Sequence, residues 1–522
     1  MQDPLSRLAI LYGTDKFGFH DYTPAYHKLL NEWKDRPLRM LEIGVGGYGD
    51  EDRGGESLEV WRDYFPNGEI TGIDIQRKSM DLGPRVRILQ GSQVDPDFLT
   101  GTVADHGPYD IILDDGSHRN EHVVESFGLL FPTLEPGGFY IIEDVQTAFF
   151  PRFGGSLELE DPNSVGMVGK LFLAMPESGI SAGVAAIERF HNILALRKHD
   201  PAGPALGVAD HRAMALGTGR IAAQTLPGHQ ANDPDILSGA ILQAGTGGIV
   251  VIEGWPEDRS LIHDVFVQMD HREIAIHFPD APIRDIAKKV LSLAAYPDGL
   301  VLEIGDNDYP SNFAFDQSHP QVVEATRLMA DILRAPEARP NGLLQYAQML
   351  QRQHGHEATF DILDRLAGMG CTERRYFQMA LARAKRQRNW DDLVALSEQA
   401  LQHFPDNPEF LADLADGLNR LGRSDEALMM LRQAYKANPR GRALVLGLAR
   451  LEQLAGDYDT AIRLFERSIN MFPRQARPAR LRQLARLCIR LDRPVEAARA
   501  CTRWLEVEPD SAEAAEIMAE ID

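Results

Sequence analysis

An apolar run that ends in polar residues, Tyr109–His118, constrains the fold of this chain more than any other stretch. It reads YDIILDDGSH, so apolar residues give way at once to two carboxylates, a glycine, a hydroxyl and an imidazole. Such a run is typical of a parallel strand that is buried on both faces. In open α/β sheets ligands bind beyond the carboxyl ends of the strands, so these polar residues are the first candidates for a functional site.

Further apolar runs precede and follow this strand, and segments with helical spacing lie between them. They cover residues 38–43, 69–75, 85–89 and 137–144. Alternation of strand and helix at this rhythm predicts a doubly wound parallel sheet of the Rossmann type. We assign this α/β fold to residues 1–200.

Residues that follow the first three strands suit a nucleoside ligand. Gly44 and Gly46 permit a tight turn and a close approach of the backbone to the ligand. Asp74 ends the second strand, where a carboxylate can accept hydrogen bonds from a ribose diol. Ser92 and Gln93 follow the third strand and are placed to line an adenine edge. The glycine pattern by itself also fits dinucleotide binding, so an NAD-dependent sugar enzyme is one alternative.

Four carboxylates stand at the tips of two neighbouring strands: Asp114, Asp115, Glu143 and Asp144. Converging acids repel each other, so either some are protonated or a cation lies among them. Oxygen ligands favour a hard ion such as magnesium. One or two of the acids can instead cap helices or accept loop amides. Asp114 can face the cofactor, touch the metal shell or brace the loop, and we assign it to the cofactor.

His118 lies three residues after Asp115. It can be a metal ligand, a general base or a loop histidine with purely local hydrogen bonds. A base needs a pKa near the working pH, which histidine supplies by default. Its place beyond a strand's carboxyl end favours the base.

Residues 201–335 form a second α/β segment in this interpretation. Gly247–Gly254 repeats the pattern of Gly137–Asp144 at an offset of 110 residues, which suggests a degenerate copy of the later half of the first domain. A single further strand is expected at Arg189–Arg197. The copy has no counterpart to Asp114–His118, so a structural or pairing role is favoured.

Residues 336–522 resemble tetratricopeptide repeats. Four prolines that close helices, Pro405, Pro439, Pro473 and Pro509, are separated by 34, 34 and 36 residues. A period near 34 residues with proline after the second helix is typical of that repeat. The stack of helical hairpins then forms an all-α solenoid whose inner face can hold a protein or peptide partner, or serves as an oligomerising appendage.

The composition restricts the class of partner and the compartment. A formal net charge of −23 argues against nucleic-acid and anionic-membrane binding, because both surfaces would repel the protein. The cysteines Cys371, Cys488 and Cys501 have no metal-ligand spacing, which is typical of a reducing cytoplasm. No apolar run is long enough for a membrane span, so we expect no membrane insertion. An oligomer is compatible with the sequence.

Several of these motifs together resemble a known family. They are Leu41–Gly47, Ile73–Ile75, Gly91–Asp95, Asp114–His118 and Ile142–Thr147, with the loop Gly13–Gly18 before them. The same combination is found in metal-dependent S-adenosylmethionine (SAM) methyltransferases that act on sugar hydroxyls of macrolide antibiotics, the mycinamicin type. The resemblance covers about residues 5–200. It implies that Glu42, Gly44 and Asp74 hold SAM, that Asp115, Glu143 and Asp144 hold magnesium, and that His118 is the general base.

The function expected from this resemblance is magnesium-dependent methyl transfer from SAM to a hydroxyl. The acceptor is expected to be a sugar of a glycoconjugate, a polysaccharide or a glycosylated small molecule. In the main alternative the repeats are the functional part, and the chain is an interaction protein with an inactive methyltransferase fold. The second α/β segment and the repeats depart from the family, and they leave the acceptor open.

Overall fold

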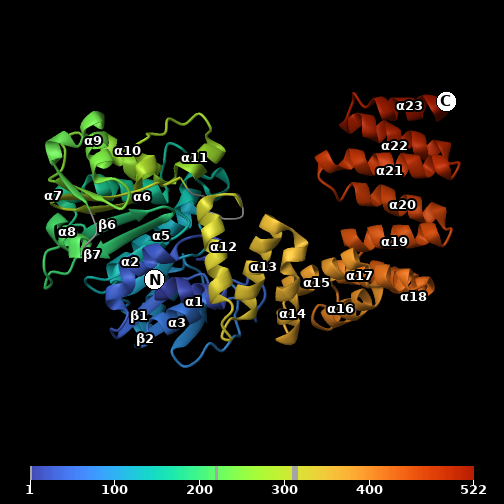
Figure 1. Cartoon of the computed structure of the whole chain (residues 1–522), viewed down its shortest axis with the longest axis horizontal. Coiled ribbons are helices and arrows are strands. Elements are labelled where there is room, and N and C mark those ends of the chain that lie inside the picture. The colour runs from blue at the N-terminus through green and yellow to red at the C-terminus, as the bar shows by residue number, and fades with distance from the viewer. Residues whose placement is uncertain (1–2, 218–221, 309–315, 522) are drawn as a thin grey trace. The chain divides into compact units, whose positions relative to one another are not determined.

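The computed structural model describes residues 3–217, 222–308 and 316–521. The chain forms two compact units, Met1–His354 and Gly355–Asp522 (Figure 1). The first is α/β and the second is entirely helical. The sequence pattern places the start of the repeats at residue 336, whereas the helix α13 (Pro340–His354) lies in the first unit.

The first unit is built on one sheet of eleven strands in the order β3-β2-β1-β4-β5-β7-β6-β10-β11-β9-β8. The strands β3, β2, β1, β4 and β5 are parallel, as predicted, and β7 runs antiparallel to β5. The strand bounds are β1 Leu38–Ile43, β2 Gly68–Asp74, β3 Val86–Gln90, β4 Ile111–Asp114, β5 Phe139–Ile142, β6 Val184–Phe190, β7 Ile193–Lys198, β8 Ala223–Pro227, β9 Ile249–Glu253, β10 Val290–Tyr296 and β11 Gly299–Ile304.

Strands of the second α/β segment continue the same sheet. The order β4-β5-β7-β6 is followed by β10-β11-β9-β8, which is the same arrangement read backwards, with β6 and β10 paired antiparallel at the centre. The turn before β5 and the turn before β9 each place a glycine at positive φ, Gly137 at 80 degrees within rounding and Gly247 at φ 80. The expected copy of the later half is therefore present as a strand arrangement.

The copy lacks the acids that follow the original strands. Glu253 and Gly254 end β9 at the offset of 110 residues from Glu143 and Asp144, and Gly254 has the positive φ of Asp144. Beyond β8 the chain continues with Gly228, where the first half has carboxylates. The second half therefore repeats the scaffold and not the cluster of acids.

The single strand expected at Arg189–Arg197 is wrong. This stretch contains parts of two antiparallel strands, β6 and β7, which are joined by a tight turn at His191 and Asn192. Asn192 adopts a left-handed conformation, with φ 58, and asparagine tolerates that conformation better than most residues do. The apolar pattern on both sides hid a turn made of only two residues.

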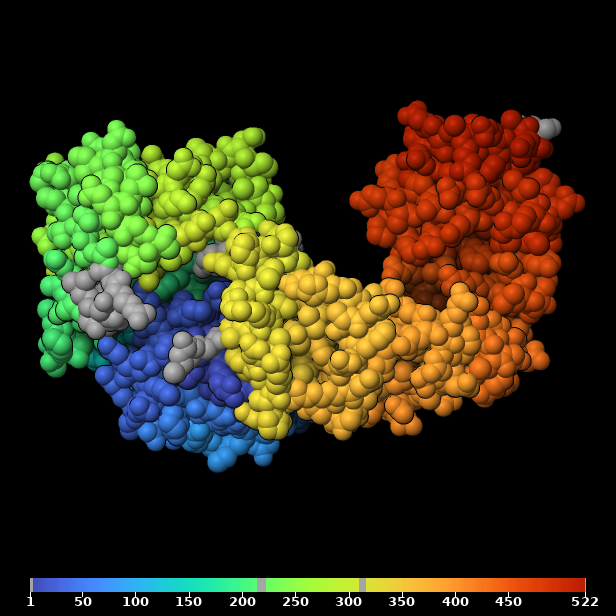
Figure 2. All heavy atoms as spheres, viewed as in Figure 1, coloured from blue at the N-terminus to red at the C-terminus, as the bar shows by residue number. Residues whose placement is uncertain are grey.

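Helices cover both faces of the sheet. On one face the core includes Leu99, Val123, Val168 and Leu261, and on the other it includes Leu5. The helices of this unit are α1 Pro4–Tyr12, α2 Thr23–Leu30, α3 Glu56–Tyr64, α4 Pro96–His106, α5 Asn120–Leu130, α6 Ser164–Leu173, α7 Met175–Ser178, α8 Val208–Gly217, α9 Pro234–Ala244, α10 Ser260–Val267, α11 His271–His277, α12 Pro320–Ile332 and α13. The later helices α12 and α13 return to pack against α1 (Figure 2).

The second unit consists of antiparallel helix pairs, as the 34-residue period predicts. Its helices are α14 Phe360–Gly368, α15 Arg374–Gln387, α16 Trp390–His403, α17 Pro408–Arg420, α18 Ser424–Ala437, α19 Arg442–Leu454, α20 Tyr458–Ile469, α21 Arg477–Arg490, α22 Pro494–Val507 and α23 Ala512–Ile521. Across both units, the described part of the chain contains no helix that is long and apolar enough to cross a bilayer.

Candidate active site

The parallel order of the strands brings the predicted polar residues to one edge of the sheet. The strand β4 lies between β1 and β5, so the loops after Ile43, Asp114 and Ile142 are neighbours. Gly44 lets two of these loops touch, because a Cβ atom on it would lie 2.1 Å from the carbonyl oxygen of Asp115. Its φ of 94 is also one that glycine adopts readily.

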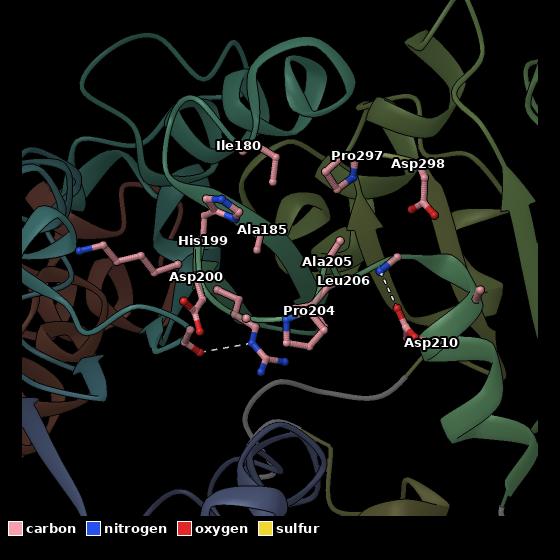
Figure 3. Close-up of a pocket in the computed structure, with 16 residues that line it drawn as sticks. Ile180, Ala185, His199, Asp200, Pro204, Ala205, Leu206, Asp210, Pro297 and Asp298 are labelled. Carbon is pink, nitrogen blue, oxygen red and sulfur yellow. Dashed lines mark hydrogen bonds between the residues drawn. The ribbon is translucent and has the colours of Figure 1, made fainter.

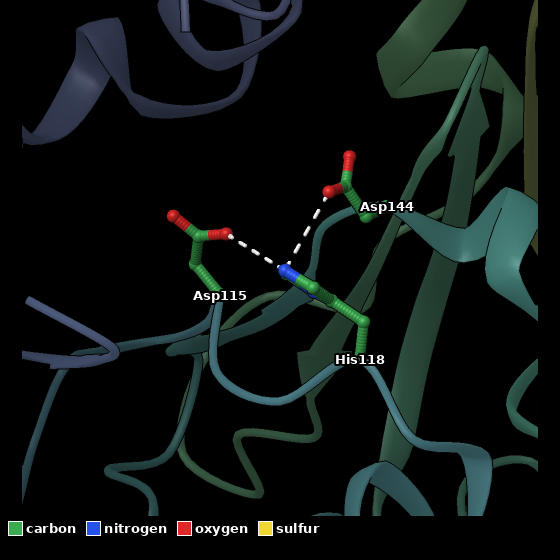
Figure 4. Close-up of side chains that lie close together, drawn as sticks. All are labelled: Asp115, His118 and Asp144. Carbon is green, nitrogen blue, oxygen red and sulfur yellow. Dashed lines mark ion pairs between the residues drawn. The ribbon is translucent and has the colours of Figure 1, made fainter. Parts of the chain in front are cut away.

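Asp115, His118 and Asp144 form the centre of this edge (Figure 4). The His118 Nε2 atom lies 3.9 Å from Asp115 Oδ1 and 3.6 Å from Asp144 Oδ2. One ligand atom from each of the three residues lies within 4.8 Å of the other two. The imidazole and both carboxylates therefore face one small volume, which is the arrangement expected for a metal site or a proton-transfer site.

Two of these residues have backbone conformations that are uncommon outside glycine. His118 has φ 54 and Asp144 has φ 52. Residues in such conformations cost stability and are concentrated at functional sites. The surrounding structure holds both side chains toward the same point, at the expense of relaxed loop geometry.

Positive neighbours keep Asp144 ionised. Burial by itself would raise the pKa of this carboxyl, but His20 and His118 together with the hydroxyl of Tyr22 lower it to about 2. The Tyr22 hydroxyl donates a short hydrogen bond to Asp144 Oδ1. A carboxylate in this state is available to pair with a cation throughout the neutral pH range.

Lys16 is a site residue that the sequence analysis did not identify. Its side chain is almost fully buried, and its Nζ atom lies 2.7 Å from Asp115 Oδ2, 2.7 Å from Glu143 Oε1 and 3.4 Å from Glu42 Oε1. Burial would lower the pKa of this amine, yet Asp115, Glu143 and Glu42 raise it well above its usual value. One ammonium group thus neutralises acids from β1, β4 and β5.

Glu143 faces Lys16 and not the cluster around His118. Its Oε1 atom accepts hydrogen bonds from Lys16 Nζ and from the hydroxyl of Tyr26. Burial and the nearby Asp115 carboxylate raise the pKa of Glu143 well above its usual value. The predicted role of Glu143 as a metal ligand stays a prediction, because the described geometry groups only Asp115, His118 and Asp144.

The residues predicted to hold the cofactor lie beside this cluster, at the ends of β1 and β2. Asp74 accepts hydrogen bonds from the backbone N–H groups of Val45 and Gln76, which fix the turn that contains Gly44. Glu42 is fully buried, and its Oε2 accepts a hydrogen bond from Ser57. Burial raises the pKa of Glu42 to about 7, although Lys16 acts in the opposite direction.

Asp114 braces the loop, which is one of the roles that the sequence left open. Its carboxylate accepts hydrogen bonds from Gln93, Ser126, Tyr140 and the backbone of Gly116. Gln93 in turn accepts a hydrogen bond from the backbone N–H of Ser117. The assignment of Asp114 and Gln93 to the cofactor stays a prediction.

Ser92 lies on the same side of the sheet, after β3. Its hydroxyl accepts a hydrogen bond from the backbone N–H of Val94, and its side chain is partly exposed. Gly46 has φ 77, and a Cβ atom there would have one neighbour at 3.9 Å. Both residues border open space beside Asp74, and their predicted contact with the cofactor remains untested.

A separate cavity lies at the opposite ends of the strands, away from these residues (Figure 3). Its volume is about 370 Å³, and it is lined by the turn between β10 and β11, the end of β7 and the start of α8. Asp298 accepts a hydrogen bond from the backbone N–H of Val208 there. None of the predicted site residues lines this cavity.

Sequence relatives were compared with the chain next. A region of this chain is 39% identical over 208 residues to mycinamicin VI 2''-O-methyltransferase of Micromonospora griseorubida, which covers 37% of this chain and 52% of the relative. Another is 44% identical over 167 residues to 8-demethyl-8-alpha-L-rhamnosyl tetracenomycin-C 2'-O-methyltransferase of Streptomyces olivaceus, covering 32% and 44%. The N-terminal region is homologous to sugar O-methyltransferases. The chain spans about half the length of these curated relatives.

The structural comparison and the family model concern different parts of the chain. MycE methyltransferase in complex with Mg, SAH and mycinamycin VI is 40% identical, covers 39% of this chain and 57% of its own, and superposes with a TM-score of 0.36. A tetratricopeptide repeat model matches residues 418–483 and 453–521. The predicted repeats are therefore confirmed for the last four helical pairs that these ranges reach.

Proposed function

We propose that the chain transfers a methyl group from SAM to a sugar hydroxyl, with magnesium as the required ion. The observation that carries the proposal is the convergence of Asp115, His118 and Asp144 at the carboxyl ends of β4 and β5. The homology to sugar O-methyltransferases over residues of the same unit supports it. In this proposal residues 1–200 carry the chemistry, residues 201–335 extend the sheet, and residues 336–522 hold a partner.

The residues present fit both absent groups. Two carboxylates and an imidazole that share one small volume are suitable ligands or neighbours for a divalent ion, and Asp115 and Asp144 would hold it. On the cofactor side, Glu42 Oε1 is buried and accepts no hydrogen bond within the described residues, so it has a free acceptor position. Gly44, Gly46 and Asp74 stand next to it and would hold SAM.

The protein residues have distinct tasks in this reaction. When bound, SAM supplies an activated methyl group, and magnesium lowers the pKa of the hydroxyl that it orients. The acceptor oxygen forms a bond to the methyl carbon while the bond from that carbon to sulfur breaks. His118 Nε2 takes the hydroxyl proton, and the resulting imidazolium is stabilised by Asp144 and Asp115, which lie 3.6 Å and 3.9 Å away.

The acceptor is proposed to be a hydroxyl of a sugar on a glycoconjugate or a glycosylated small molecule. The named relatives modify the sugars of mycinamicin and of rhamnosyl tetracenomycin. Methyl transfer needs the two reacting atoms to be aligned, and neighbouring sugar hydroxyls give an ion two points of attachment. Incubation with radiolabelled SAM and a panel of glycosides, followed by extraction of labelled product, tests this class of acceptor.

A ligand screen separates this function from its alternatives. A ligand that binds only the folded state raises the melting temperature. We expect SAM and S-adenosylhomocysteine to raise it and NAD to leave it unchanged, with a further increase when magnesium is added. A response to NAD alone would replace the proposal with an NAD-dependent enzyme. No response to any of these ligands would favour an interaction protein with an inactive fold.

Substituting Lys16 with methionine is expected to weaken metal binding and turnover by about 10–100-fold, the usual effect of losing a group that orients a metal ligand. The acids Asp115, Glu143 and Glu42 would lose the cation that they share, and burial would then drive some of them to take up protons. Calorimetric titration with magnesium and a turnover assay measure the two effects.

Two further variants make this prediction specific. Lys16→Arg keeps the charge and should restore part of the metal affinity. Lys28→Met removes a partly exposed lysine of the same N-terminal segment, which pairs with Glu303 at 2.6 Å, and should leave metal affinity unchanged. A Lys16→Met protein that melts earlier but binds magnesium normally would show that Lys16 serves stability alone.

A further inference from the structure

Charge is distributed unequally between the two units. Residues 355–522 hold 25 basic and 26 acidic side chains, a net charge of −1, so residues 1–354 carry the other −22 of the total of −23. Within the second unit, residues 440–503 hold 14 arginines, no lysine and 6 acids. The repulsion of anions that the total charge implies therefore does not extend to this part of the repeats.

Three of these arginines line a groove in the repeats. The groove has a volume of about 200 Å³ and is formed by α19, α20 and α21. Arg450, Arg480 and Arg490 lie along it, and Leu484 and Leu487 form part of its buried floor. The groove thus combines an apolar floor with positively charged walls.

The arginines of the groove differ from arginines elsewhere on the same helices. Arg482 and Arg486 of α21 both pair with Glu513, and Arg499 of α22 pairs with Glu466. Among the residues that the structure describes, Arg450, Arg480 and Arg490 have no carboxylate partner; Arg480 donates a hydrogen bond to Gln483 and stacks on Phe472. The groove therefore presents guanidinium groups whose charge is not neutralised within the protein.

We propose that this groove binds a segment of a partner protein in which acidic side chains alternate with apolar ones. Guanidinium groups form paired, charge-assisted hydrogen bonds with carboxylates. Apolar side chains of the same segment would fill the floor at Leu484 and Leu487, where arginine and apolar contacts together are typical of the strongest points of an interface. The proposal specifies the partner that residues 336–522 were proposed above to hold.

The test uses the full chain and a short fluorescein-labelled peptide in which glutamates alternate with leucine and alanine. Fluorescence anisotropy should show saturable binding that weakens as salt is added. A peptide with glutamine at every glutamate position should bind at least about 10-fold more weakly, which corresponds to the loss of one strong contact.

Two triple variants of equal charge separate a specific groove from general attraction. R450Q/R480Q/R490Q should weaken binding of the acidic peptide at least about 10-fold. R482Q/R486Q/R499Q removes the same charge from paired arginines and should change binding less than about twofold. All six side chains are on the surface of one unit or its groove, and circular dichroism checks that both variants stay folded.

Three results would overturn the proposal. One is equal loss of binding in both triple variants, which indicates general electrostatic attraction. Another is tighter binding of a single-stranded oligonucleotide of equal charge, also lost in the first variant, which makes the groove a site for nucleic acid. The last is self-association of the chain through the groove without peptide binding. Methyl transfer to a free glycoside is measured separately, so its failure and the failure of this proposal are distinguishable.

Discussion

Replacing Asp115 with asparagine is expected to lower turnover at least about 1000-fold. A bound divalent ion contributes several kcal/mol to the reaction it assists, and each 1.36 kcal/mol is a factor of ten in rate. Asparagine retains the shape of the side chain but removes the charge that faces both Lys16 and the point shared with His118 and Asp144. Calorimetry should show that magnesium binding is lost while SAM binding remains measurable.

Two comparisons make the Asp115 result interpretable. Asp105→Asn changes an exposed acid of α4 in the same unit and should leave turnover unchanged. In the unaltered protein, EDTA should abolish activity and excess magnesium should restore it. Activity that persists in EDTA, or normal turnover in Asp115→Asn, would exclude the proposed role of the ion.

Replacing His118 with alanine is expected to lower turnover by about 10²–10⁴-fold, the usual contribution of a positioned general base. The acceptor hydroxyl would then have no imidazole to take its proton. If His118 is the base and not a ligand, SAM and magnesium should both bind the variant with nearly normal affinity. The two binding constants come from calorimetry, and the rate from labelled methyl transfer.

His122→Ala is the matched control for this variant. His122 lies on α5, one turn beyond the loop, and its Nδ1 atom is 2.8 Å from the hydroxyl of Ser117. Its removal should change turnover little. Loss of magnesium binding in His118→Ala would assign His118 to the metal, a role that its distances to Asp115 and Asp144 also permit.

The chemistry-bearing strand ends were predictable because they depend on local patterns. Apolar runs that end in Gly44, Asp74 and Asp115 indicate buried parallel strands, and the parallel order then requires their polar tips to share one edge. The sequence also predicted the helical repeats from a 34-residue period. Both predictions rest on regularities that can be counted along the chain.

Contacts between distant segments were not predictable in this way. Lys16 lies in a loop rich in glycine and aspartate, and nothing in its neighbours distinguishes a buried lysine from an exposed one. Only folding places it against Asp115, which is 99 residues away, and Glu143, which is 127 residues away. Similarly, Glu143 and Asp144 are adjacent in sequence, yet their carboxylates have different partners.

The amino-acid sequence by itself determined the kind of chemistry, the sheet that carries it and the repeats that follow. The tertiary structure decided how the acids are divided: Asp144 with Tyr22 and His118, Glu143 with Lys16 and Tyr26, and Asp114 with the loop that it braces. It also decided that β8–β11 extend the first sheet in reversed order. The physical reason is that a buried charge must find its counter-charge in space, and spacing along the chain does not record which one it finds.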